Sequence, residues 1–255
     1  MKVFNYHTAE WQLALAYTLP LMVSALLALL IAVIVWRRRS IPGAIPLVVL
    51  SIAAAEWSLA YALEIAAAPT AAAIVLARLQ YLGIMALPVA WVLFALEYSN
   101  LGYAINRRTV SLLLVIPVLT QIAVWTNEFH GLIWPSITLN MSGPFPILEF
   151  SHGVGFWICN IYSHISLALG VFILLRGFLQ AQRLYLRQIM VFVAGALAPW
   201  LGNGLYVLNL TPWPGLDLSP FGFTFTAGAI AFGLLRLRFM EVVPIARDLI
   251  FENMN

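Results

Sequence analysis

Charged residues are scarce in this 255-residue chain: they make up 9% of it, while hydrophobic residues make up 63%. A soluble domain carries about 25% charged residues and cannot bury so much apolar surface in a core of this size. The mean hydropathy of +0.94 points the same way. The chain is therefore predicted to be an integral membrane protein with the lipid bilayer as a partner. Its net charge of +3 is thinly spread and does not favour nucleic acid.

Two residue types that occur once each exclude further classes of protein. Cys159 is the single cysteine, so neither an internal disulfide nor a thiolate metal cluster is possible. Lys2, the single lysine, lies ahead of the first apolar segment. A retinal Schiff base needs a lysine inside the bundle, so retinal is excluded, and no other cofactor is expected. No Walker loop, nucleophile elbow or glycine-rich phosphate loop is present, so no catalytic domain is predicted.

Seven apolar segments are each long enough to cross a bilayer, which takes about 20 helical residues. They are predicted at residues 11–36, 45–67, 73–98, 109–126, 153–176, 187–209 and 219–237. Eleven of the thirteen basic residues fall in or beside the connections on one side, and Lys2 and Arg78 fall on the other. The positive-inside rule then places the N-terminus outside and the C-terminus in the cytoplasm, in the cell membrane. The fold class predicted is an all-α seven-transmembrane bundle.

Two connecting regions stand out from the short loops. Residues 126–152 contain two β-prone runs, 132–139 and 145–150, around an Asn-Met-Ser-Gly-Pro turn, which predicts a β-hairpin on the outer side. The hairpin is interpreted either as a lid or as an ordered connection. Residues 238–255 predict the start of a cytoplasmic helix too short to be stable alone. We therefore expect residues 1–237 to be the membrane domain and the chain to continue into another module.

Charged groups inside spanning helices are costly and usually face the bundle interior, so each one suggests a function. Glu56 and Glu64 lie eight residues apart and share one face of the 45–67 segment. Arg78 should lie at the depth of Glu64, which predicts an ion pair, with separate snorkelling to water as the alternative. Glu56 has no cation at its depth, so it is expected to stay protonated, to hydrogen-bond across helices or to meet a ligand.

Polar and aromatic residues of several segments are expected to converge on a small-molecule site in the outer half of the bundle. The alternative is hydrogen bonding that only holds the helices together. The chain's four histidines lack a recognised ligand spacing, so no metal site is predicted. The candidate ligand-binding residues are Glu56, Trp57, Tyr61, Glu64, Arg78, Tyr81, Asn160, His164, Trp200, Asn203, Tyr206 and Asp217.

Several stretches together resemble the seven-helix N-terminal sensory region of bacterial and archaeal histidine kinases. They are Glu56-Trp57, residues 77–100 (ARLQYLGIMALPVAWVLFALEYSN), Thr126-Asn127 with His130 and Trp134, Gly155-Phe156-Trp157, Arg187-Gln188, residues 217–221 (DLSPF) and residues 243–247 (VPIAR). The resemblance covers nearly the whole chain and rests on the order and spacing of these stretches. It implies an input domain, usually dimeric, followed by PAS, histidine-kinase or diguanylate-cyclase modules. It implies no particular ligand.

The leading hypothesis is therefore a sensory input domain that detects a small molecule or a change in the membrane and signals through its last helix. Binding can shift such a switch only if the ligand prefers one arrangement of the helices. A transporter or channel using Glu56 and His164 is the alternative, although no internal repeat supports it. A purely structural assembly domain is the third.

Overall fold

The structure is a computed structural model that describes residues 8–68, 70–141, 145–178, 183–208, 210 and 217–233. Side chains are described from residue 15 in the first helix and from residue 190 in α7. The predicted end of the seventh segment, residues 234–237, and the predicted cytoplasmic helix, residues 238–255, lie outside the described residues.

Helices make up most of the described chain. They are α1 (Thr8–Trp36), α2 (Ala44–Ala67), α3 (Ala71–Tyr98), η1 (Gly102–Ala104), α4 (Arg107–Trp125), α5 (Asn127–His130), α6 (Val154–Phe178), α7 (Arg183–Val207) and α8 (Ser219–Phe232). Six of these helices, α1 to α4, α6 and α7, are long and apolar enough to cross a membrane. Their ends lie within four residues of the predicted boundaries. The described part of α8 has 14 residues and begins at the predicted position, Ser219.

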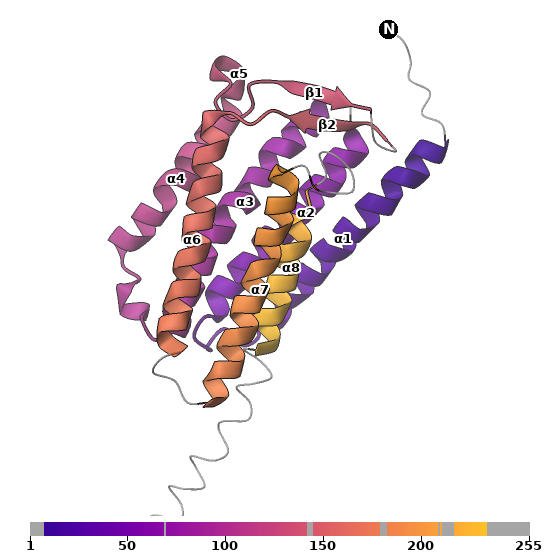
Figure 1. The fold of residues 1–255 in the computed structure, drawn as a ribbon. Coiled ribbons are helices and arrows are strands. Elements are labelled where there is room, and N and C mark those ends of the chain that lie inside the picture. Colours follow the sequence, from indigo (N-terminus) through magenta and orange to yellow (C-terminus); the bar gives the residue numbers. More distant parts are fainter. Residues whose placement is uncertain are drawn as a thin grey trace, which may run out of the picture.

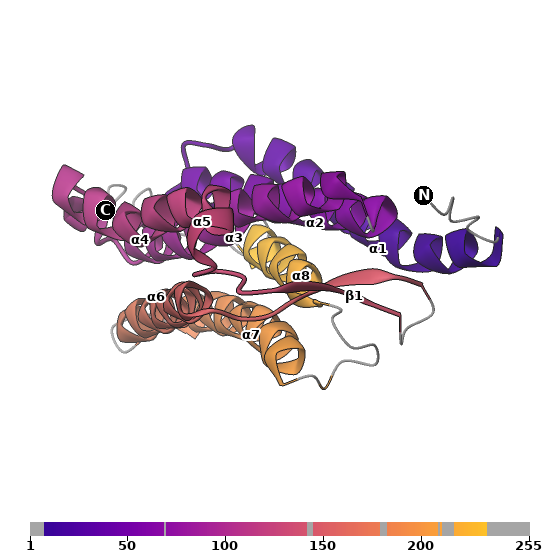
Figure 2. The same ribbon diagram turned by 90° about the horizontal axis from the view of Figure 1, so that it is seen from above.

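The helices form two layers with α8 between them (Figure 2). Helices α1 to α4 lie side by side in one layer in chain order, and α6 and α7 form the second. Helix α8 packs against α7, α1 and α2. Helix α8 therefore connects α7 of the second layer to α1 and α2 of the first layer.

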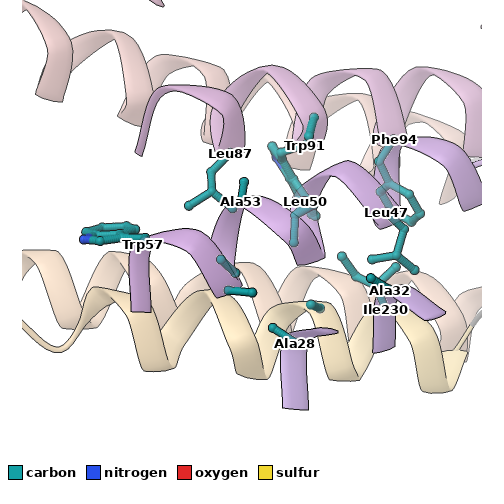
Figure 3. Packing of buried hydrophobic residues seen from close by; sticks show 14 of the residues in the cluster. Ala28, Ala32, Leu47, Leu50, Ala53, Trp57, Leu87, Trp91, Phe94 and Ile230 are labelled. Carbon is teal, nitrogen blue, oxygen red and sulfur yellow. The ribbon is translucent and has the colours of Figure 1, made fainter. Parts of the chain in front are cut away.

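Small residues allow the helices of the first layer to approach closely. Figure 3 shows Ala32 of α1 near Leu47 of α2 and Ile230 of α8, and Ala53 of α2 near Leu87 of α3. All of these side chains are buried. Dense packing of small residues is the usual source of helix association where lipid removes the hydrophobic drive. The large apolar side chains on the outer faces, such as Leu26, Leu112 and Leu201, stay exposed, as a bilayer requires.

Two glycines of the bundle lie where a neighbouring helix leaves no room for a side chain. A Cβ on Gly83 of α3 would be 2.5 Å from the carbonyl oxygen of Ala53 in α2. A Cβ on Gly170 of α6 would collide with the indole of Trp91, whose Nε1 donates to the Leu167 carbonyl at 3.0 Å. Both helix pairs therefore depend on a missing side chain at the crossing.

A two-stranded antiparallel sheet crosses one end of the bundle (Figure 1). Strand β1 (Ile137–Asn140) pairs with β2 (Ile147–Phe150), with Ile137 opposite Phe150 and Asn140 opposite Ile147. We call this end of the bundle the hairpin end. The hairpin was predicted, but the first strand starts five residues later than expected, and the short helix α5 was missed.

The late start of β1 has a clear cause. Asn127 at the start of α5 donates from Nδ2 to the Trp134 carbonyl at 2.9 Å. Its Oδ1 accepts from the amides of Ile133 and Trp134 at 2.9 and 3.1 Å. These bonds hold residues 132–134 in a turn and bury Ile133 and Trp134 under the loop. Side-chain bonding to the backbone thus replaces strand pairing in this segment.

Candidate ligand-binding site

A cavity of about 280 Å³ lies at the hairpin end between the bundle and strand β2. We call it the hairpin-side cavity. It is lined by Trp57, Tyr61, Glu64, Ile65 and Ala68 of α2 and its end, Ala77, Gln80, Tyr81 and Ile84 of α3, Trp134, Ile147–Phe150 of β2, Ser151, His152, Phe156 of α6, Tyr206 of α7 and Asp217. Its walls combine aromatic rings with carboxyl, amide and hydroxyl groups.

A second cavity of about 100 Å³ lies farther from the hairpin, and we call it the deeper cavity. Both cavities are lined by Trp57, Tyr81, Ile84, Phe156, Tyr206 and Asp217, so they adjoin. The deeper cavity is mainly apolar and adds Met85 and Pro88 of α3, Cys159, Asn160, Ser163, His164 and Leu167 of α6, Pro199, Trp200 and Asn203 of α7, and Ser219 and Phe223 of α8.

The two cavities bring together ten of the twelve residues predicted from the sequence. Glu56 and Arg78 line neither cavity. Glu56 lies in α2, and its Oε2 accepts a hydrogen bond at 2.8 Å from the backbone amide of Gly83 in α3. This is the cross-helix hydrogen bond that was one of the three expectations for Glu56. Since His164 lines the deeper cavity, the two residues of the predicted polar relay share neither cavity.

The predicted ion pair between Glu64 and Arg78 is wrong. Arg78 Nη2 instead bonds Glu128 Oε1 at 2.5 Å, and its guanidinium lies 5.9 Å from the centre of the Trp125 ring. Glu64 is 5% exposed and accepts from the side-chain amide of Gln80. The cause is α5, which turns Glu128 back over the start of α3. The sequence reading treated that segment as loop, so Glu128 was not considered as a partner.

Asp217 links the cavities to the start of α8. Its backbone N–H donates to the Tyr61 hydroxyl at 2.9 Å, which ties it to α2. Its Oδ1 accepts from the Ser219 amide at 2.8 Å in the first turn of α8. Burial raises the pKa of Asp217 to about 6, while the bonds from Ser219 oppose that rise. At neutral pH the carboxylate is therefore mostly ionised.

The polar groups of the deeper cavity come mainly from α6 and α7. Asn160 Nδ2 donates to Asn203 Oδ1 at 3.0 Å and joins the two helices. The backbone carbonyl of Asn160 accepts a hydrogen bond from His164 Nδ1 at 2.8 Å. Because a carbonyl can only accept, the proton of the imidazole is on Nδ1. His164 stacks on Trp200 with ring centres 6.3 Å apart. The buried Nε1 of Trp200 has no hydrogen-bond partner among the described residues.

Sequence reasoning missed the contribution of the hairpin segment to the cavity lining. His152 stacks on Phe156 with ring centres 3.8 Å apart, and its Nε2 lies 3.4 Å from the Tyr206 hydroxyl. Burial lowers the pKa of His152, which favours the neutral ring. Glu149 of β2 and Gln80 of α3 also line the hairpin-side cavity. Nothing in the sequence distinguishes Glu149 or His152 from ordinary loop residues, because the fold of the hairpin over the bundle decides their place.

A family model for the N-terminal 7TM region of histidine kinase matches residues 20–244. The chain belongs to this family. A comparison with curated proteins finds no match. The 7TM region of histidine kinases is a non-catalytic, multi-pass membrane sensory input domain, and it implies a downstream kinase module. The resemblance identified from the sequence is thereby confirmed.

Proposed function

We propose that this 7TM sensory region detects a small molecule in its two adjoining cavities and signals through α8. The observation that carries the proposal is that the residues opening α8 are also cavity walls. Asp217 lines both cavities, and Ser219 and Phe223 line the deeper one. A molecule that enters the cavities therefore contacts the start of the last described helix directly.

Helix α8 is connected to the rest of the bundle by hydrogen bonds as well as by packing. Thr224 Oγ1 accepts from Ser24 of α1 at 2.7 Å, and Thr226 Oγ1 donates to the Gly195 carbonyl of α7 at 2.7 Å. A ligand that binds one position of α8 better than another shifts the population toward that position. Residues after 233 then carry the shift to the output module.

The proposed topology has seven spans, with α8 continuing as the seventh and the hairpin end outside the cell. Arg37–Arg39 follow α1, Arg107 and Arg108 begin α4, and Arg176 lies in the last turn of α6. Figure 1 shows these helix ends opposite the hairpin. Basic residues gathered at one end support a cytoplasmic position for that end.

The experiment joins the chain to a histidine-kinase module and measures autophosphorylation in membrane vesicles. Tyr61→Phe removes the hydroxyl that accepts from the Asp217 amide while keeping the ring. Tyr103→Phe is the matched control, because Tyr103 is 82% exposed in η1 and lies far from the cavities in sequence and fold.

Tyr61→Phe is expected to change kinase output at least threefold, with folding retained as judged by the thermal unfolding midpoint. Tyr103→Phe is expected to leave output unchanged. Equal output from wild type and both variants, with all three folded, would contradict signalling through the Tyr61–Asp217 contact.

A further inference from the structure

The charges that line the two cavities are of one sign. Glu149 of β2 and Asp217, in the residue pair before α8, contribute carboxylates to the hairpin-side cavity, and the buried Glu64 of α2 adds a carboxyl group that is not counted as a charge. Among the described residues, neither cavity has a lysine or arginine in its walls. Arg78 of α3 forms an ion pair with Glu128, and neither residue lines a cavity.

Among the residues that the structure describes, the hydrogen-bond partners of these carboxyl groups are all neutral. Glu64 accepts from Gln80, Glu149 from the side-chain amide of Asn140 at 3.1 Å, and Asp217 from the Ser219 amide. Neutral donors satisfy the oxygens of Glu149 and Asp217 but leave the negative charge of these two carboxylates uncompensated. An anion would be repelled from such a cavity, whereas a cation would be attracted.

The aromatic lining favours an organic cation over a metal ion. Trp57, Tyr61, Tyr81, Trp134 and Tyr206 line the hairpin-side cavity, and the faces of such rings attract ammonium groups. In the described part of the chain, no three His, Cys, Asp or Glu residues are close enough to hold a metal ion. The carboxyl groups are thus spread around a space larger than a metal site.

The lining of the deeper cavity indicates which chemical group is attached to the cationic group. It holds the apolar side chains of Ile84, Met85, Leu167 and Phe223, and its size suits one ring or a short alkyl chain. The buried Nε1 of Trp200, which lines this cavity, has no hydrogen-bond partner among the described residues. Buried N–H groups are normally hydrogen-bonded, so this one independently indicates a missing ligand atom.

We propose that the adjoining cavities bind a small amphiphilic organic cation, with its ammonium group in the hairpin-side cavity and a compact apolar group in the deeper one. This inference rests on the proposed sensory function and names the chemical class of its ligand.

The test uses three probes that share a phenyl ring and a short chain but differ in charge. They are 2-phenylethylammonium, 2-phenylethanol and 3-phenylpropanoate. Binding to the purified chain in nanodiscs of zwitterionic lipid is measured by isothermal titration calorimetry at pH 7.5, with empty nanodiscs as the partition blank. The ammonium probe is expected to bind at least about tenfold more tightly than the alcohol, and the carboxylate probe is expected not to bind.

Two charge-removing variants assign the preference to the cavity. Asp217→Asn and Glu149→Gln are each expected to weaken ammonium binding several-fold and to leave binding of the alcohol unchanged. Glu149 is an exposed strand residue, so Glu149→Gln keeps the test valid if Asp217→Asn fails to fold. Glu97→Gln is the charge-matched control, because Glu97 lies near the opposite end of α3 and lines neither cavity, and it should leave affinity within twofold.

Equal affinity for the ammonium and alcohol probes, or tighter binding of the carboxylate, would overturn the assignment to cations. So would binding of the ammonium probe that neither cavity variant weakens, or no binding of any probe. These results are separate from the kinase output of Tyr61→Phe, which tests the sensory function without a ligand. The ligand class can thus fail while the function stands, and the reverse is also possible.

Discussion

The crossing of α2 and α3 at Gly83 provides the sharpest quantitative test of the structure. The perturbation is Gly83→Ala, which adds one methyl group to a residue in the middle of α3. That methyl would lie 2.5 Å from the Ala53 carbonyl oxygen and 2.5 Å from Glu56 Oε2. The first obstacle is helix backbone, which cannot rotate away. The two helices must therefore separate, or α3 must bend.

The magnitude follows from three effects. Overpacking a tight contact costs about 1–3 kcal/mol. Separation of the helices also weakens the hydrogen bond from the Gly83 amide to Glu56, and a bond to a carboxyl group contributes about 1.5–3 kcal/mol if it is charged. Alanine returns about 1 kcal/mol through its higher helix propensity. The net expectation is a loss of about 2 kcal/mol in the free energy of unfolding.

The assay is reversible unfolding in mixed micelles with a denaturing detergent, followed by far-UV circular dichroism. Gly204→Ala in α7 is the matched control, since no atom of the described residues lies within 4 Å of a Cβ built there. It should leave stability unchanged or raise it. Adding Glu56→Ala removes one of the two obstacles, so Gly83→Ala should cost less in that background. If the two glycine variants differ by less than about 0.5 kcal/mol, the close crossing described here does not exist.

Three further variants test other parts of the molecule. Trp91→Phe removes the indole bond to the Leu167 carbonyl and should cost about 1 kcal/mol of unfolding free energy by the same assay, whereas Trp36→Phe, at a half-exposed residue, should cost less. Asn127→Ala removes three side-chain hydrogen bonds and should speed hydrogen exchange at the amides that follow α5 by more than tenfold. Asn127→Asp keeps the acceptor oxygen and should speed this exchange less. Equal exchange rates in the two variants would contradict the role of Oδ1. Because burial raises the folded-state pKa of Asp217, the folded protein binds more protons than the unfolded chain, so this carboxyl group should lower stability as pH rises from about 4 to about 6. The difference in unfolding free energy between wild type and Asp217→Asn should follow that direction and level off above pH 6, and a difference independent of pH would refute the raised pKa.

The spanning helices were predictable because their signal is strong and local. A long apolar run between polar ends has few alternatives in a membrane, so the ends of α2 and α3 could be placed within two residues. The convergence of Tyr61, Tyr206 and Asp217 also followed from the sequence. Polar groups in spanning helices avoid lipid, so those at one depth tend to meet inside the bundle.

The partners of the charged residues were less predictable. The ion pair between Glu64 and Arg78 was predicted from their equal depth in the membrane alone. Equal depth does not determine the direction in which a long side chain points. Arg78 turns toward Glu128 because α5 brings that carboxylate within 2.5 Å, and Glu64 is left to the amide of Gln80. A four-residue helix has too few residues to produce a periodic pattern, so α5 could not be predicted.

The glycine contacts depend on a helix crossing that no single segment encodes. Gly83 and Gly170 each lie in an ordinary apolar run, and glycine is frequent in membrane helices. Their importance becomes visible only when Ala53 and Trp91 are seen against them. The hydrogen bond from the Gly83 amide to Glu56 could not be predicted for the same reason, because the two groups meet only where α2 and α3 cross closely.

The two ends of the bundle differ in a way that suits transmission of a shift rather than its absorption. The hairpin end contains both cavities, whereas farther along α3 the rings of Phe94 and Tyr98 pack against Phe192 of α7, with centres 5.4 and 4.9 Å apart. Helix α8 begins at the cavity wall with Ser219 and reaches this cluster at its other end, where a Cβ on Gly233 would lie 2.5 Å from the Phe192 ring. Close-packed interiors respond to a displacement by moving as units, because they have little free volume to absorb it. A helix that starts beside a cavity and ends against packed rings therefore has room to move at its cavity end, and its other end cannot shift without displacing Phe192.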